Sequence, residues 1–449
     1  MLSDIGINIH LHNFFAPDRG GERSMNLKGR AVISTLSAIA AVAFSASAAV
    51  EAPFEVGTWA NFCDGAVSHT FDDNKNTNPT GEGQQIYDEK KFHMTLCVQT
   101  NSVNWENCKA SFAKGHEISS HTTDHYTSDA AARDSRSAIR ENVPGEQCVT
   151  IAYPDCQQRG VNILQYYLAG RNCSGQLNST TPGQWDQINS KMFGSGNGGN
   201  CNTADCLNEY ANNAATANGW SVYCFHGIGS DWHDYATIDI NAMKDHLDYL
   251  DENRDKIWIE TFGSVTRYIK ERDAANIEVE SSTDDSIVIS VTDDLPDSIF
   301  NYPLTIRRPV PEGWATIIVT QGDFDTEDSV VTQDGEEYVM FKAIPDSDNV
   351  VITRITTGSR TVGHTGKLNG VAPVTFNRSS TLTIDRNYFN GSNLSVAFFD
   401  LTGKVIARYT LGADENSVAL PTSQISRSAC IVKIAGKGVT YTGKFMPQL

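Results

Sequence analysis

The chain has few basic residues for its length, and this shortage excludes one class of partner. Its 449 residues include 35 Lys and Arg against 54 Asp and Glu, giving a formal net charge of −19 at pH 7. Proteins that bind nucleic acid neutralise phosphates with clustered basic side chains, so we expect no nucleic-acid partner. The acidic balance also disfavours a strongly anionic substrate, whereas it is compatible with a neutral polysaccharide.

Long apolar runs are missing except near the N-terminus. There, two basic residues precede a small-residue apolar run over Ala31–Phe44, and Ala46–Ala48 has the form of a cleavage site. This pattern is typical of a secretory signal peptide starting at Met25, with a buried helix as the alternative. We therefore predict an N-terminal extension and signal peptide over residues 1–48. The mature protein is then secreted, extracellular or at the cell surface, with no membrane span.

Repeated CxxC motifs are also missing, which argues against a structural zinc site made of cysteines. Nine of the ten cysteines lie between Cys63 and Cys224, and only Cys430 stands apart. Such crowding suits disulfides that join loops in an oxidising compartment, and an odd number in this region leaves one cysteine free. The closely spaced pairs are Cys97/Cys108, Cys148/Cys156 and Cys201/Cys206.

Short apolar segments alternate with polar or helix-like ones over residues 54–273. This alternation predicts an α/β domain with a parallel sheet, open or closed into a barrel. Within it, Thr180–Asn218 is rich in Gly, Asn, Ser and Thr, and we expect a long surface excursion there. The expected strands are Ala66–Phe71, Phe92–Val98, His116–His121, Cys148–Tyr153, Trp220–Phe225 and Lys256–Thr261.

Strand signals dominate the rest of the chain and predict two small β-sandwich-like domains, at 277–356 and 371–449, joined by a linker near Thr356–Gly370. The first has few aromatic residues, which favours a spacer over a glycan-binding module. Leu394–Val405 and Ala429–Ile434 resemble the C-terminal sorting domains of proteins exported across a bacterial outer membrane by a type IX-like route. That resemblance implies outer-membrane secretion machinery as a partner, and an ordinary carbohydrate-binding or fibronectin-like sandwich is the alternative.

Two adjacent carboxylates follow the first strong strand candidate. Asp72 and Asp73 come directly after Ala66–Phe71, at the carboxyl end of a strand, where α/β enzymes gather their sites. Burying two neighbouring carboxylates is unfavourable unless a cation or a proton lies between them. A solvated turn or a helix cap is the alternative explanation of the acid pair alone.

Three histidines stand in positions that suit a catalytic metal site. His121 and His125 are four residues apart, so one helical turn would direct both imidazoles to a single point. Two imidazoles and one carboxylate, with open positions for water, are a common catalytic zinc set. His226 follows the strand candidate that ends at Phe225. Taken separately, the first two histidines are equally explained as exposed loop residues and His226 as a buried structural residue.

These groups occur in a fixed order, each closing an expected strand: acid pair, histidine pair, a Tyr-Pro segment and a late histidine. In this order, Phe54–Arg272 resembles the polysaccharide deacetylase family, the NodB-homology domains of carbohydrate esterase family 4. Thr70–Asp73 matches the family's TFDD motif and Ser120–His125 its H-x3-H motif. Phe225-His226 matches its late histidine motif with Phe in place of Leu. The resemblance implies a distorted (β/α) barrel.

The resemblance also implies roles for these side chains. Asp73, His121 and His125 would hold one divalent metal ion, with Zn²⁺ favoured by the ligand set. A water activated by the metal would attack the acetyl carbonyl. Asp72 would act as the general base and His226 as the general acid. The metal also explains why two adjacent acids are tolerated.

One motif departs from the family. The arginine that orients the base is missing, because Ala152 and Tyr153 precede Pro154. Arg171 is a candidate substitute, with a surface arginine as the alternative, and the backbone N–H of Tyr153 is the expected oxyanion donor. The acid that partners His226 stays open among Asp186, Asp231 and Asp234.

We therefore predict a secreted, metal-dependent hydrolase that removes acetyl groups from an acetylated polysaccharide. It would cleave either a non-peptide carbon–nitrogen bond, as in N-acetylglucosamine glycans, or an acetyl ester, as in acetylxylan. Both substrates need the same catalytic residues, and export, acidity and the appended β domains slightly favour xylan. The alternative is a catalytically impaired glycan-binding protein on a deacetylase scaffold, which the missing motif arginine would explain.

Overall fold

The computed structural model describes residues 54–195, 201–229, 235–314, 317–333 and 335–354. Further on it describes residues 374–376, 381–386, 389, 393–399, 405–419, 430–436 and 439–445. The predicted signal peptide, the predicted linker and the candidates Asp231 and Asp234 lie outside these residues. Among the described helices, none has the length and apolar character needed to cross a membrane.

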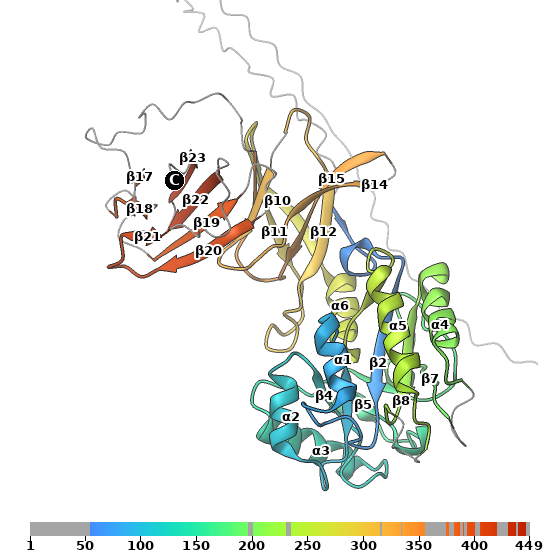
Figure 1. Ribbon diagram of the computed structural model, residues 1–449. Helices are drawn as coiled ribbons and strands as arrows, with labels where there is room; N and C mark the ends of the chain where they lie inside the picture. The colour runs from blue at the N-terminus through green and yellow to red at the C-terminus, as the bar shows by residue number, and fades with distance from the viewer. Residues whose placement is uncertain are drawn as a thin grey trace, which may run out of the picture. The chain divides into compact units, whose positions relative to one another are not determined.

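The first domain is built on a parallel sheet whose central strand, β2 (Gly65–Phe71), leads into the acid pair. All seven residues of β2 are buried, as expected for a strand covered on both faces. The strand order is β6-β5-β4-β3-β2-β8-β7, and β9 also pairs with β2 (Figure 1). This sheet and its helices confirm the predicted α/β class. The other strands are β3 (Thr95–Val98), β4 (Glu117–Ser120), β5 (Thr150–Ala152), β6 (Ala169–Arg171), β7 (Lys191–Met192), β8 (Trp220–Phe225) and β9 (Ile257–Ile259).

A short segment joins the two edges of this sheet. Ile188 forms a parallel bridge with Arg171 of β6, and its N–H donates to the carbonyl oxygen of Gly170 at 2.9 Å. Slightly further along the chain, β7 pairs with β8. The strands therefore form a distorted barrel in which the closing strand has only two residues.

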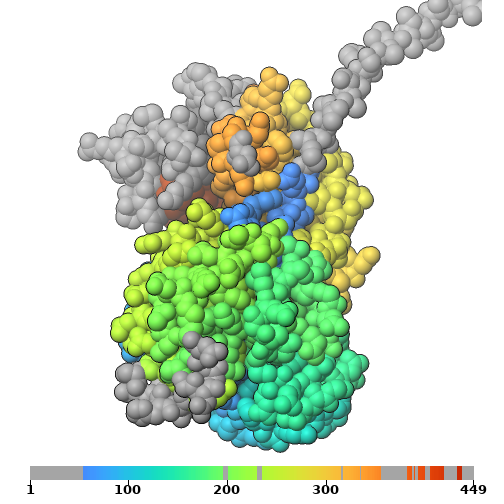
Figure 2. All heavy atoms as spheres, turned by 90° about the vertical axis from the view of Figure 1, so that its right-hand side faces the viewer, coloured from blue at the N-terminus to red at the C-terminus, as the bar shows by residue number. Residues whose placement is uncertain are grey.

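The stretch Thr180–Asn218 belongs to this barrel, so the prediction of a surface excursion is wrong. It contains β7 and the helix α4 (Ala204–Ala217). The sequence did not indicate α4 because its flanking loops are polar and rich in glycine, and because half of the residues on its buried face are alanines. Trp59 Nε1 donates to Asn218 Oδ1, at the end of this stretch, over 2.8 Å. Figure 2 shows the first described residues of the chain, in blue, against green residues of the barrel. The residues that α4 buries are Leu207, Tyr210, Ala211 and Ala214.

Of the five other helices of the domain, four begin at residues whose side chains accept from free N–H groups, and α1 has no such cap. The side chain of Asn104 caps α2, and Ser128 accepts from the N–H of Ala131 at the start of α3. Thr261 caps α6 in the same way, accepting from the N–H of Ser264. These helices are α1 (Glu82–Lys90), α2 (Trp105–Phe112), α3 (Asp129–Asn142), α5 (Ile240–Glu252) and α6 (Phe262–Ala274).

A buried chain of polar side chains connects β2 to the helices α1, α5 and α4. His69 Nδ1 lies 2.7 Å from the Tyr87 hydroxyl, and His69 Nε2 lies 3.3 Å from His246 Nε2. His246 Nδ1 lies 2.6 Å from Asn208 Oδ1. All these groups are satisfied when Tyr87 donates to His69, His69 to His246, and His246 to Asn208. This arrangement requires both imidazoles to be neutral, and burial lowers the pKa of His69 and lowers that of His246 to about 3.

Replacing His246 with glutamine should therefore cost less stability in acid than at neutral pH. In the unfolded chain a histidine takes up a proton near pH 6.5, whereas folded His246 stays neutral to a much lower pH. Protonation of His246 in acid thus stabilises the unfolded wild-type chain, and the H246Q chain lacks this contribution. We expect the difference in unfolding free energy to shrink by about 2 kcal/mol between pH 7 and pH 5. Urea unfolding of both proteins at the two pH values measures it.

His93 supplies a control with the opposite sign. Its hydrogen bond to Glu260 raises the pKa of His93 despite partial burial. Its contribution to stability is therefore present below the unfolded pKa and is lost as the pH rises, so H93Q should cost more in acid than at neutral pH. Equal pH slopes for wild type and H246Q would show that His246 is not held neutral.

Two antiparallel sheets form a β-sandwich from residues 276–354 together with β1, with strand orders β1-β12-β15-β14 and β10-β11-β16-β13. Along β11 (Ser286–Thr292) burial alternates, and Ile287, Ile289 and Val291 point into the core. The strand β1 (Glu55–Val56) comes from before the barrel and pairs with β12. One sandwich sheet therefore includes the start of the described chain. The remaining strands are β10 (Asn276–Ser282), β12 (Leu304–Pro309), β13 (Ile317–Gln321), β14 (Ser329–Gln333), β15 (Glu336–Ala343) and β16 (Val350–Arg354).

The described residues beyond 374 form two more antiparallel sheets, β17-β18-β21 and β20-β19-β22-β23. Val396, Phe398, Val432 and Ile434 are fully buried in their shared apolar core. These sheets account for the strand signals of the C-terminal region, while its resemblance to a sorting domain stays a prediction. The strands are β17 (Val374–Phe376), β18 (Thr381–Ile384), β19 (Leu394–Phe399), β20 (Val405–Leu411), β21 (Ser417–Ala419), β22 (Cys430–Gly436) and β23 (Val439–Phe445).

Candidate active site

The two adjacent acids that follow β2 have different surroundings. Asp72 continues the line of β2, donating its N–H to the carbonyl oxygen of Phe225 at 2.9 Å, and its side chain is buried. Asp73 and Asn74 have φ values of 65° and 57°, in the left-handed region that short polar residues tolerate best. This turn leaves the carboxylate of Asp73 24% exposed, whereas that of Asp72 is 5% exposed. The acid pair is therefore split between a buried group and an accessible one.

Asp73 meets the histidine pair. His121 follows β4 and His125 lies in the loop beyond it. Asp73 Oδ1 is 3.5 Å from His121 Nε2 and 3.5 Å from His125 Nε2, and the three ligand atoms lie within 4.8 Å of one another. Two ligands about 2.1 Å from a zinc ion at the tetrahedral angle are about 3.4 Å apart. The three residues thus fit one divalent metal ion with a fourth position open.

Hydrogen bonds fix the orientation of two of these three groups. His121 Nδ1 lies 2.9 Å from the carbonyl oxygen of Ala152, so it carries the proton and leaves the lone pair of Nε2 facing Asp73. Gln99 Nε2 donates to Asp73 Oδ1 at 2.7 Å, and the Gln99 backbone N–H is held by Asn74 Oδ1 at 2.9 Å. Sequence reasoning missed Gln99, although its place directly after a strand gave the same signal as for the acids.

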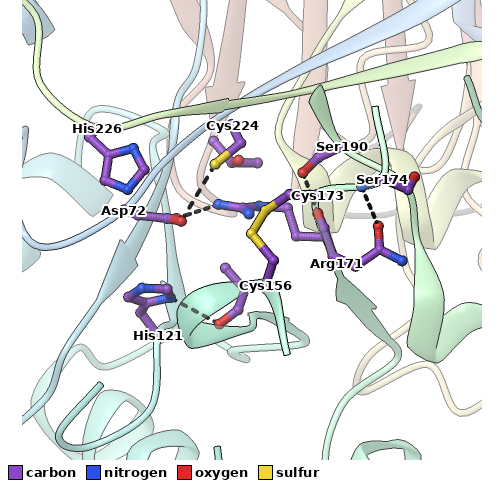
Figure 3. The surroundings of a disulfide bond; sticks show 12 residues. Asp72, His121, Cys156, Arg171, Cys173, Ser174, Ser190, Cys224 and His226 are labelled. Atoms are coloured by element: carbon purple, nitrogen blue, oxygen red, sulfur yellow. Dashed lines mark hydrogen bonds and ion pairs between the residues drawn. A yellow bond between two sulfur atoms is a disulfide. The ribbon is translucent and has the colours of Figure 1, made fainter. Parts of the chain in front are cut away.

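Arg171 is buried beside Asp72. It ends β6, and its Nη2 donates to Asp72 Oδ1, as Figure 3 shows. Burial opposes ionisation of Asp72, but the Arg171 guanidinium, with smaller contributions from His121 and His226, holds the pKa of Asp72 well below its usual range. Arg171 has 0% exposure, so the alternative of a surface arginine is wrong. The structure thus brings the candidate base together with the arginine that sequence reasoning proposed as its partner.

Cys224 contacts the other oxygen of Asp72, with Sγ 3.6 Å from Oδ2 (Figure 3). Burial raises the pKa of the Cys224 thiol to about 12, so the group is a neutral, weak donor. Sequence reasoning assigned no role to Cys224. Its position on β8 could have indicated the contact, because Cys224 pairs with Thr70 and Thr70 lies two residues before Asp72.

His226 lies on the other side of Asp73, its Nε2 being 3.7 Å from Asp73 Oδ2. Asn76 Nδ2 donates to the backbone carbonyl oxygen of His226 at 2.5 Å and fixes the chain after β8. His226 Nδ1 is buried and has no hydrogen-bond partner among the described residues. Of the three acids considered as its partner, Asp186 accepts instead from Gln158 Nε2 at 2.8 Å.

The expectation for Tyr153 is wrong. Its backbone N–H donates to the carbonyl oxygen of Arg171 at 3.2 Å, and its hydroxyl donates to the carbonyl oxygen of Asp186 at 2.8 Å. The N–H is therefore committed to the sheet and is no free oxyanion donor. The reason is β6, a three-residue strand beside β5 that sequence reasoning did not recognise.

The disulfides differ from the spacing-based expectation. Cys201 pairs with Cys206 as expected, but Cys156 pairs with Cys173. Cys97, Cys108 and Cys148 are buried free thiols, so the pairs Cys97/Cys108 and Cys148/Cys156 are wrong. Cysteines in this domain also serve as small apolar residues of the barrel core, which spacing alone does not reveal. The other free cysteines in the described residues are Cys63 and Cys224.

The disulfide Cys156–Cys173 joins the loop after β5 to the loop after β6 (Figure 3). The first loop follows Ala152, the acceptor of His121, and the second follows Arg171. Replacing both cysteines with serine should lower the unfolding free energy by about 3 kcal/mol, because the bond closes a loop of 17 residues. Urea unfolding measures this loss.

The second disulfide provides the control. Cys201–Cys206 spans only five positions, so its double serine variant should lose less stability. An unchanged unfolding midpoint in the Cys156/Cys173 variant would show that the bond does not constrain the unfolded chain.

Residues 60–148 match the family model of polysaccharide deacetylases. This segment contains the acid pair and the histidine pair of the site. The chain therefore carries a polysaccharide deacetylase domain, which confirms the resemblance read from its motifs.

Individual relatives are more distant. The chain is 29% identical over 325 residues to a gellan lyase from a Bacillus species, a match that covers 66% of this chain and 13% of that protein. Among solved structures, a family 4 acetyl xylan esterase from Clostridium thermocellum is 16% identical, with a TM-score of 0.30 over 44% of this chain and 89% of the other. A peptidoglycan deacetylase from Bacillus subtilis is 13% identical, with a TM-score of 0.28 over 46% and 93%.

Proposed function

We propose that the protein is a metal-dependent hydrolase that removes acetyl groups from a polysaccharide. The observation that carries this proposal is the separation of roles between the two adjacent acids. Asp73 faces His121 and His125 at metal-ligand spacing, whereas Asp72 is buried in an ion pair with Arg171. A purely structural acid pair would have no reason to combine an accessible three-ligand set with a buried, charge-stabilised carboxylate.

Each residue has a role that follows from its surroundings. A divalent metal ion held by Asp73, His121 and His125 would polarise the acetyl carbonyl and lower the pKa of a water molecule. Asp72 takes the proton of the attacking water, since Arg171 keeps it ionised and fixed in place. His226, on the opposite oxygen of Asp73, donates a proton to the departing sugar oxygen or nitrogen.

The substrate we propose is a neutral acetylated polymer, with acetylxylan favoured over N-acetylglucosamine glycans. The net charge of −19 disfavours anionic chains and is compatible with a neutral polymer. Zinc as the metal, export by the N-terminal signal peptide and recognition of the C-terminal domain by outer-membrane secretion machinery belong to the same proposal. They rest on the ligand types and on the sequence patterns alone.

Acetate release and metal content test the proposal together. Zinc-loaded protein should contain one metal ion per chain and release acetate from acetylxylan, from hexa-N-acetylchitohexaose, or from both. A chelator should abolish the release, and added zinc should restore it. Metal at full occupancy without turnover of either polymer or of a simple aryl acetate would favour the glycan-binding alternative.

A further inference from the structure

One segment, residues 98–101 after β3, contacts the parts of the chain that carry the candidate metal ligands. The carbonyl oxygen of Val98 accepts from the N–H of His121 at 2.8 Å. The N–H of Thr100 donates to the carbonyl oxygen of Thr122 at 3.1 Å, and the next pair of residues repeats this contact at 3.0 Å. The segment therefore holds the backbone of the loop that bears both histidines of the ligand set.

The remaining residue of the segment, Gln99, holds the third candidate ligand. Gln99 Nε2 donates to Asp73 Oδ1 at 2.7 Å. This is the oxygen that lies 3.5 Å from Nε2 of both His121 and His125, whereas Oδ2 lies 3.7 Å from Nε2 of His226. A carboxylate oxygen has two lone pairs, so the bond from Gln99 uses one of them on Oδ1 and leaves the other for a cation.

Gln99 is itself held on both sides of its backbone by the side chain of Asn74. Asn74 Oδ1 accepts from the N–H of Gln99 at 2.9 Å, and Asn74 Nδ2 donates to the carbonyl oxygen of Gln99 at 3.3 Å. Asn74 directly follows Asp73, and both residues have a positive φ. The turn that presents the carboxylate of Asp73 thus also presents the amide that fixes its hydrogen-bond donor.

We propose that Gln99 is a positioning residue that sets the affinity of the site for a divalent metal ion by directing Asp73 Oδ1 toward it. This inference rests on the proposed metal-dependent function. Asp73 is the accessible acid of the pair, so without the Gln99 amide its carboxylate would be free to rotate. Metal binding would then have to order that carboxylate at a cost in conformational entropy. Loss of a group that orients a metal ligand typically weakens metal binding 10- to 100-fold.

Zinc dissociation constants, measured by competition with a chromogenic chelator, test this inference. Gln99→Met keeps the length of the side chain but cannot donate, so its constant should rise about 10- to 100-fold. Asn74→Gly removes the amide that holds Gln99 and allows the φ of 57°, and its constant should rise by a smaller factor. Gln165→Met is the matched control, because Gln165 Nε2 also donates to an aspartate at 2.7 Å, Asp129, which is outside the ligand set. It should bind zinc as the wild type does.

Thermal unfolding of the metal-free proteins separates positioning from a general structural role. The expected result is a raised zinc constant in Q99M with a metal-free midpoint close to that of Q165M. A lowered metal-free midpoint with an unchanged zinc constant would show that Gln99 only stabilises the loop. Zinc binding by Q99M that is as tight as in the wild type, or tighter, would equally overturn the inference. A wild-type protein that binds no zinc would instead overturn the proposed metal-dependent function.

Discussion

Replacing His121 with alanine is expected to remove both the metal and the activity, whereas Asp72→Asn should keep the metal and lose turnover. His121 is 2% exposed and supplies one of the three ligand atoms that lie together in the described part of the chain, so its loss leaves two of them. Asp72 touches Arg171 and Cys224 and does not belong to the ligand set. The loss expected for removing a general base is roughly 10²- to 10⁴-fold in kcat.

Metal content by elemental analysis and acetate release, measured on the same preparations, check this pair of results. His93→Ala is the matched control for His121, because His93 is bonded to Glu260 and takes no part in the ligand set. It should keep both metal and activity. A nearly full rate in Asp72→Asn would show that another group is the base. Full metal content in His121→Ala would show that the ligand set is wrong.

Arg171→Met should lose activity at neutral pH and regain part of it in alkali. With the guanidinium gone, only the smaller contributions of His121 and His226 oppose the effect of burial on Asp72, so its pKa should rise and more of the base should be protonated. Raising the pH would ionise it again. Breaking a buried ion pair on one side also costs about 3–5 kcal/mol of stability.

The pH dependence of kcat and the unfolding free energy measure these two effects. In the wild type the folded pKa of Asp72 lies below the unfolded one, so its contribution to stability is complete above the unfolded pKa of 3.8 and is lost as the pH falls further. Arg171→Lys keeps the charge and should fall between wild type and R171M. Arg133→Met, at an exposed position of α3, should change neither quantity. A pH profile of R171M identical to that of the wild type would show that Arg171 does not act on Asp72.

The local sequence was sufficient to predict the site residues that follow long strands or lie close together in the chain. Asp72 and Asp73 follow a seven-residue apolar strand, and His226 follows one of six residues. His121 and His125 are only four residues apart, which suggested that they meet. The expected helical turn between them is wrong, because Thr122 and His125 have φ values of 66° and 61° and the segment is a loop. The carboxyl ends of parallel strands lie at one edge of a sheet, and for that reason the order of motifs along the chain already placed these groups in one site.

The sequence was insufficient to predict contacts that are made by very short strands or by segments next to polar loops. The strands β6 and β7 have three and two residues, too few to show any periodicity. For the same reason, the loss of the Tyr153 N–H to the sheet could not be foreseen. The stretch with α4 was misread because its loops are polar and half of its buried stripe is alanine.

The sequence by itself indicated the chemistry proposed for this protein, because its motifs are those of a polysaccharide deacetylase domain and include three candidate metal ligands and an adjacent candidate base. Only the tertiary structure decided what holds that base. Arg171 lies 99 residues from Asp72, and Gln99 lies 26 residues from Asp73. The pairing of Cys156 with Cys173 was likewise decided by the tertiary structure. The positions of these four residues depend on the register and closure of the barrel. Register and closure arise from packing among distant segments and leave no local pattern in the sequence.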